Sequence, residues 1–196
     1  MAEVPEALQE VAEEGRNRGF TRRVALTTAF YAVLLAITSL GGNNATKEML
    51  LAQQQASDQW AFYQAKVIRE HYYRAQALRL EVELLERGPA MGPTVRAKFE
   101  ELHAKFAEEA KRYGAEKGDI ERDARRLEHE RDLNQARDPN FDFAEALLQI
   151  AIVVASVGIL AASRALYAVS VAFAVVGTLL CLNGYLLLVR FPLAGH

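Results

Sequence analysis

The apolar residues of this chain are concentrated in three blocks that carry no charge. They occupy residues 24–40, 146–163 and 165–189. A helix of about 20 apolar residues crosses a hydrocarbon layer of about 30 Å, because each residue adds about 1.5 Å. The pattern therefore predicts three transmembrane helices in an all-α membrane protein.

Between the first two blocks the chain becomes polar, but apolar residues continue at helical spacing. On the first stretch they are Met49, Ala52, Ala56, Trp60, Tyr63, Val67, His71, Ala75, Leu78, Val82 and Leu85. On the second stretch they are Val95, Phe99, Leu102, Phe106, Ala110, Tyr113, Ile120, Ala124 and Leu127. Two prolines and two glycines within residues 88–93 predict a turn between the stretches, with Thr94 capping the second. Neither arm can bury its stripe alone, so we expect a long antiparallel, coiled-coil-like helical hairpin between the first and second spans.

These signals divide the chain into segments. We expect a cytoplasmic amphipathic tail (1–23), transmembrane helix 1 (24–42), an extramembrane hairpin (43–137, arms 45–87 and 94–135), transmembrane helix 2 (138–163), transmembrane helix 3 (165–190) and a short tail (191–196). Pro139 is expected to end the second arm and begin the next helix, since proline suits a first helical turn. Poor helix formers at residues 41–44, and Gly114 with Gly118, leave open whether the helices are continuous there.

Basic residues set the predicted orientation. Arg16, Arg18, Arg22 and Arg23 precede the first block, whereas only Lys47 follows it closely. Because basic residues favour the cytoplasmic side, we expect a cytoplasmic amino terminus and a periplasmic hairpin in a bacterial inner membrane. The first block is read as an uncleaved anchor, since the preceding tail is long and acidic for a signal peptide.

Small residues line one face of the first span. Thr28, Ala32, Ala36, Ser39 and Asn43 recur there at helical spacing. Small side chains let helix backbones approach closely, which is a main source of helix association in lipid. This face is therefore expected to be a packing surface, and a pore lining is the alternative.

The first arm also carries apolar side chains outside its stripe. Leu50, Leu51, Phe62, Ile68, Tyr72 and Leu80 lie outside or at the border of the stripe. Burying them requires neighbouring copies, so we expect a homo-oligomer. Trp60 and Tyr63 lie on the stripe, and Trp60 is expected to be a packing anchor between the arms or between protomers, with a binding surface as the alternative.

Catalytic and metal-binding motifs are lacking in the sequence. Glu100 and His103 have the Glu-x-x-His spacing of di-iron bundles, but those sites need two such motifs. We therefore expect no enzyme activity, cofactor or metal. The net charge of −2 gives no nucleic-acid footprint, and the single Cys181 allows no disulfide within the chain.

Two stretches resemble a known family. Residues 36–47 (AITSLGGNNATK) and 56–66 (ASDQWAFYQAK) are similar to the bacterial membrane family called domain of unknown function 4337. The resemblance covers nearly the whole chain and implies the same membrane topology. It implies no activity.

Two functions fit these expectations. The first is a non-enzymatic structural or interaction protein, a membrane-anchored homo-oligomer with projecting hairpins. The second is an oligomeric ion channel or transport accessory subunit. The lipid bilayer and other copies of the chain are the expected partners.

Overall fold

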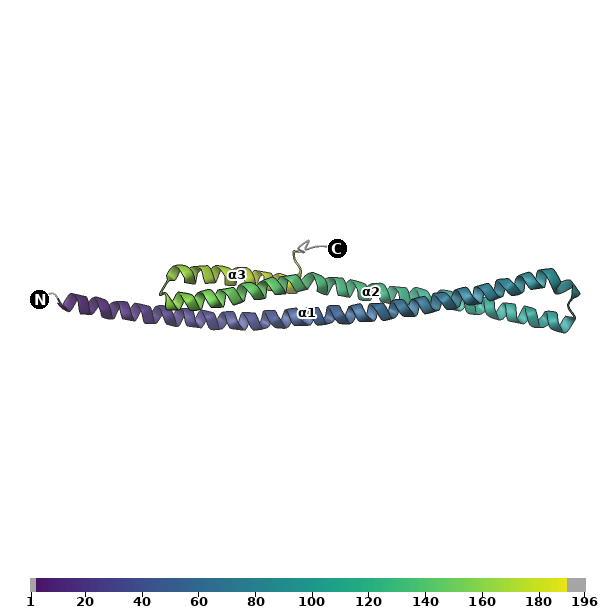
Figure 1. Cartoon of the computed structure of the whole chain (residues 1–196), viewed down its shortest axis with the longest axis horizontal. Coiled ribbons are helices and arrows are strands. Elements are labelled where there is room, and N and C mark those ends of the chain that lie inside the picture. The colour runs from purple at the N-terminus through teal and green to yellow at the C-terminus, as the bar shows by residue number, and fades with distance from the viewer. Residues whose placement is uncertain (1–2, 190–196) are drawn as a thin grey trace. The chain divides into compact units, whose positions relative to one another are not determined.

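The computed structural model describes residues 3–189, with side chains from Arg18 onward (Figure 1). Its elements are α1 (Glu3–Arg87), the 3-10 turn η1 (Gly88–Ala90), α2 (Pro93–Leu160) and α3 (Arg164–Leu186). The described residues include no strand, which confirms the all-helical class with three helices. The tail expected at 191–196, and the first two residues of the tail expected at 1–23, lie outside the described part.

The chain forms two compact units. The three-helix unit combines residues 1–49 with residues 132–196, and the hairpin unit is Leu50–Arg131. Each of the three helices contains a stretch that is long and apolar enough, by length and composition, to cross a membrane.

The break predicted at Pro139 is wrong, because α2 is helical from Pro93 to Leu160. Proline lacks a backbone N–H and crowds the carbonyls of the preceding turn. One of these carbonyls, that of Ala136, accepts a hydrogen bond from the Asn140 side-chain Nδ2 at 3.0 Å. The bond that Pro139 removes would have gone to the Gln135 carbonyl, so this side-chain bond does not replace it. The helix continues because Asn140 and Phe141, just beyond the proline, are buried, and such packing outweighs local helix propensity.

The two other segments where the sequence left helix continuity open are also helical. Helix α1 is continuous through residues 41–44, and α2 is continuous through Gly114 and Gly118. Gly41 is needed for close packing, because a Cβ there would lie 2.6 Å from the Phe141 ring. The predicted turn at residues 88–93 is present, but α2 already begins at Pro93, so Thr94 is a helical residue and does not cap.

The two arms of the hairpin unit meet along a seam that repeats every seven residues. Its shielded positions alternate in steps of three and four. On α1 they are Ala52, Ala56, Gln59, Tyr63, Lys66, Glu70, Tyr73, Ala77, Leu80 and Leu84. On α2 they are Phe99, His103, Phe106, Ala110, Tyr113, Lys117, Ile120, Ala124, Leu127 and Arg131.

The predicted stripe on the first arm is correct only up to Val67. Beyond it, His71, Ala75, Leu78, Val82 and Leu85 are exposed. The predicted stripe follows the 3.6-residue period of a straight helix, whereas the seam repeats every 3.5 residues. The two patterns drift apart by about 20° per heptad, which carries the stripe out of the seam within a few heptads.

Small residues allow close contact between α2 and α3 in the three-helix unit. Ala151, Ala155, Ser170, Ala174 and Gly177 are all buried. A Cβ at Gly177 would lie 3.1 Å from the carbonyl oxygen of Ala144, so the α3 backbone approaches α2 directly. The small residues of α2 and α3 are thus used for packing within the chain.

Polar side chains fix the far end of α3. Asn183 Nδ2 donates to Asn140 Oδ1 at 2.7 Å and to the Val189 carbonyl at 2.8 Å, and Asn183 Oδ1 accepts from the Val189 backbone N–H at 2.9 Å. The helix ends at Leu186, and the C-cap residue Leu187 adopts a left-handed conformation with φ 47°. The side chain of Asn183 is therefore committed to contacts with Asn140 and Val189.

Candidate functional site

The hairpin seam contains a charged cluster. Glu70 is 3% exposed, and its two oxygens accept from Lys117 Nζ at 2.6 Å and Arg74 Nη2 at 2.6 Å. The hydrogen bond from Lys117 is the main cause that lowers the pKa of Glu70, although burial acts in the opposite direction. Glu70 therefore remains an ionised carboxylate inside the seam.

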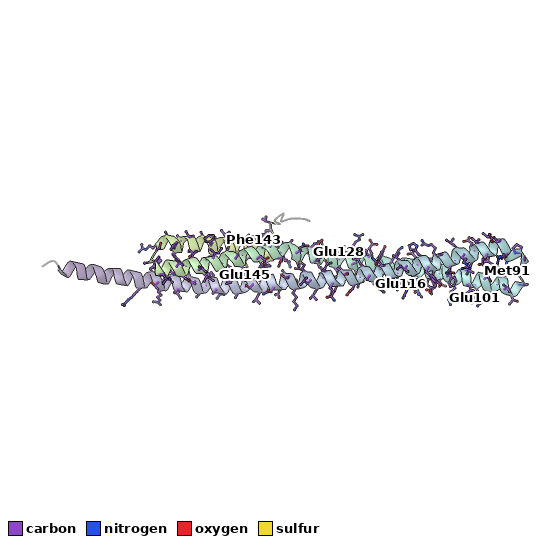
Figure 2. All side chains as sticks on the ribbon, in the orientation of Figure 1. Met91, Glu101, Glu116, Glu128, Phe143 and Glu145 are labelled. Atoms are coloured by element: carbon purple, nitrogen blue, oxygen red, sulfur yellow. The ribbon has the colours of Figure 1, made fainter. Side chains whose placement is uncertain are left out.

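Aromatic rings and cations pack beside this cluster. Tyr73 and Tyr113 stack with centroids 5.7 Å apart, and Lys66 Nζ lies 5.1 Å from the Tyr113 ring. Lys66 also pairs with Glu116 at 2.5 Å across the arms. Figure 2 labels Glu116 and Glu128 on α2, and Met91 at the turn between the arms. The cluster satisfies its own charges, so it serves the contact between the arms.

Trp60 lies between the arms, where the sequence predicts a packing anchor. It is half-buried, and its Nε1 donates to Glu128 Oε1 at 2.9 Å. Its ring meets Tyr63 edge-on at 5.4 Å, and the Arg125 guanidinium lies 5.8 Å from it. These contacts tie Trp60 and Tyr63 to the seam, so neither is free to form a separate aromatic surface.

A second line of apolar residues follows the outer face of the first arm. This outer row consists of Ala61, Ala65, Ile68, Tyr72, Ala75, Leu78, Val82 and Leu85, all exposed. Its steps of three and four resemble those of the seam. Ile68 is 67% exposed and Leu85 is 75% exposed. Phe62, Leu50 and Leu51 are also exposed, whereas Leu80 belongs to the seam and is half-buried.

The small-residue face of α1 is separate from its buried face. Ala32, Ala36 and Asn43 are exposed, and Thr28 and Ser39 are half-buried. The buried residues of α1 in this unit are instead Val24, Tyr31, Thr38, Gly41 and Ala45. At 100° per residue the two faces lie about 120° apart. In the part of the chain that the structure describes, the predicted packing face of α1 is therefore turned away from the other helices.

The described residues contain no group of three or more His, Cys, Asp or Glu side chains placed to hold a metal. Glu100 pairs with Arg96 at 3.0 Å on the same helix. The single cysteine, Cys181, is buried against α2 residues in a small apolar cluster.

Sequence reasoning placed Trp60 and Tyr63 on the stripe of the first arm but did not find the Glu70–Lys117 pair. Lys117 stands where the stripe of the second arm needs an apolar residue, between Tyr113 and Ile120. A seven-residue repeat laid over both arms places Glu70 and Lys117 on seam positions, and this signal is present in the sequence. The structure adds which position on one arm faces which position on the other, and it places Lys117 against Glu70.

Comparisons with known proteins add a family. No curated protein and no solved structure matches the chain. Residues 20–187 match the family model described as domain of unknown function, DUF4337. This match covers well over half of the sequence, so the chain belongs to the DUF4337 family.

Proposed function

We propose that this protein is a non-enzymatic membrane-anchored scaffold that forms a homo-oligomer with projecting hairpins. The outer row carries the proposal. A monomer in water would expose this row along the first arm, whereas a second copy can cover it with its own row. Steps of three and four suit a coiled-coil contact between parallel copies, in which each residue meets its counterpart.

Membrane insertion rests on the apolar stretches. Within the apolar stretch of each of the three helices, only 22–28% is buried inside the chain. Lipid accounts for the remaining surface, because a two- or three-helix contact hides only one side of each helix. The basic cluster before Val24 supports a cytoplasmic amino terminus and a periplasmic hairpin in a bacterial inner membrane.

Orientation is tested by a single cysteine at Ala90, in a Cys181→Ala background. The proposal expects labelling of intact spheroplasts by a membrane-impermeant maleimide. Labelling only after the inner membrane is permeabilised would reverse the topology.

The oligomer is tested by crosslinking full-length protein in detergent and in membranes. Ile68→Cys and Ala75→Cys, each without Cys181, are expected to form intermolecular disulfides. Glu108→Cys, an exposed position on the second arm, is the matched control and should crosslink far less. Ile68→Glu should lower the oligomer mass while helix content stays unchanged. A monodisperse wild-type monomer without crosslinks would overturn the scaffold proposal.

The unpartnered face of α1 supports a second candidate, an oligomeric channel or transport accessory subunit. A pathway between copies would be lined by the small and polar side chains of Thr28, Ser39 and Asn43. Ion flux through reconstituted liposomes that is altered by Asn43→Leu would favour the channel. A stable oligomer without flux would favour the scaffold.

A further inference from the structure

A cavity of about 230 Å³ opens in the three-helix unit, near the point where the apolar stretches end. Its lining residues are Gly41, Asn44, Ala45, Glu48, Asn134, Arg137, Phe141, Gly184 and Tyr185. All three helices contribute to it. One part of the lining is apolar and aromatic, whereas the other part carries amides and two opposite charges.

The positive charge belongs to Arg137, which is half-buried. Its Nη1 donates to Asn134 Oδ1 at 3.2 Å, and its buried Nε has no acceptor among the described residues. Among the described residues, the neutral amide of Asn134 is the only side chain that accepts a hydrogen bond from this guanidinium. Its charge is therefore only partly compensated by the chain, and guanidinium groups bind phosphate oxygens strongly.

The negative charge belongs to Glu48 on α1. Within the part of the chain that the structure describes, it forms no ion pair with Arg137, although both line the same cavity. A cavity bordered by a carboxylate and a guanidinium that do not pair with each other suits a ligand that carries both a positive and a negative charge. A ligand with only a negative charge would use Arg137 and leave Glu48 without a role.

We infer that this cavity binds the headgroup of a zwitterionic phospholipid that has a primary amine. Arg137 holds the phosphate, Glu48 holds the ammonium, and the side of Phe141 and Tyr185 receives the start of the acyl region. Pockets between membrane helices are known to hold lipid headgroups, and tyrosine is common at the membrane interface. The inference rests on the membrane insertion proposed above.

The test measures lipid binding to the purified full-length protein by native mass spectrometry. The probes are phosphatidylethanolamine, phosphatidylglycerol, which lacks the amine, and phosphatidylcholine, whose amine has no N–H. Wild type is expected to prefer phosphatidylethanolamine. Arg137→Gln should weaken binding of phosphatidylethanolamine and phosphatidylglycerol about ten-fold, and Glu48→Gln should weaken only phosphatidylethanolamine to a similar extent.

Lys47→Gln is the matched control, since Lys47 is exposed, lies next to Glu48 and does not line the cavity. It should leave the preference unchanged. Equal binding of the three lipids, or a preference that survives both cavity variants, would overturn the inference. Displacement of the lipid by millimolar inorganic phosphate, together with no effect of Glu48→Gln, would assign the cavity to a free anion and also overturn it.

Two further readouts separate this inference from the proposed function. Carbonate extraction and oligomer mass are measured on the same samples. A membrane-embedded oligomer without headgroup preference contradicts the lipid site alone, whereas release of the protein by carbonate contradicts the proposed function. If Arg137→Gln fails to fold, the exposed Glu48→Gln variant still decides the question.

Discussion

The two units hold their helices together in different ways. In the three-helix unit the closest approaches occur where side chains are missing, as at Gly177 against the Ala144 carbonyl and at Gly184 against the Phe141 ring. In the hairpin unit, long side chains such as Tyr113 and Lys117 fill the seam. Helix spacing is thus set by backbone contact in the three-helix unit and by side chains in the hairpin unit. A carbon added at a glycine should therefore lower stability in the three-helix unit, and at Gly118 in the hairpin unit it should raise it.

The largest effect is expected at Gly177. Gly177→Leu places a side chain where the Cβ alone is 3.1 Å from both the Ala144 oxygen and Leu148. Overpacking of this kind typically costs about 1–3 kcal/mol, and we expect the upper end because one neighbour is backbone. Thermal unfolding of the detergent-solubilised protein measures the loss. Gly118→Leu, with open space around the glycine, is the control, and equal destabilisation of both would refute the contrast.

A smaller loss is expected when the seam loses its cation. Lys117→Met leaves the Glu70 carboxylate buried with Arg74 as its remaining partner. Breaking a fully buried pair costs about 3–5 kcal/mol, and the retained Arg74 should reduce this to about 2 kcal/mol. The double variant Glu70→Leu with Lys117→Leu should recover most of the stability, since apolar residues can replace a buried pair. Denaturant unfolding compares the three proteins, and a double variant as weak as Lys117→Met would contradict the expectation.

Acid should weaken the hairpin through the same carboxylate. The pKa of Glu70 is lowered in the folded state, so its contribution to stability is complete above the ordinary glutamate pKa of about 4.3. That contribution is lost as the pH falls from there through the folded-state pKa, because the unfolded chain binds the proton first. The stability difference between wild type and Glu70→Gln should therefore shrink between neutral and acidic pH. A difference that stays constant over this range would exclude Glu70 as its source.

The smallest effect is expected to be a gain. Gly118→Ala adds a carbon with no neighbour within 4 Å and removes a flexible residue from the interior of α2. Such a change stabilises a helix by about 0.5–1 kcal/mol. Gly184→Ala is the counterpart, since its Cβ would lie 2.9 Å from the Phe141 ring, and it should destabilise. Calorimetry of the two variants gives the signs, and two changes of the same sign would weaken the comparison.

Strong local signals made much of the fold predictable. The three uncharged blocks lie largely within α1, α2 and α3, and the turn at residues 88–93 is present. Long apolar runs and paired prolines leave few alternative structures. Pro139 was misjudged because the residues just beyond it, Asn140 and Phe141, are buried, and tertiary packing of this kind outweighs a propensity read from local sequence.

Face assignments were harder to predict than the helices themselves. A 3.6-residue period places Leu78 and Val82 toward the second arm, but the helices wind around each other and turn those residues outward. The Glu70–Lys117 pair and the cavity beside Arg137 each need residues from different helices, so no single stretch of sequence reveals them.

The buried pair also restricts how the arms can align. An evenly repeating apolar seam would let one arm slide by seven residues with almost no loss of contact. Such a slide would bring Glu70 opposite Ala110 or Ala124, both buried and unable to neutralise a carboxylate. One polar pair therefore excludes the shifted alignments and selects a single register for the hairpin.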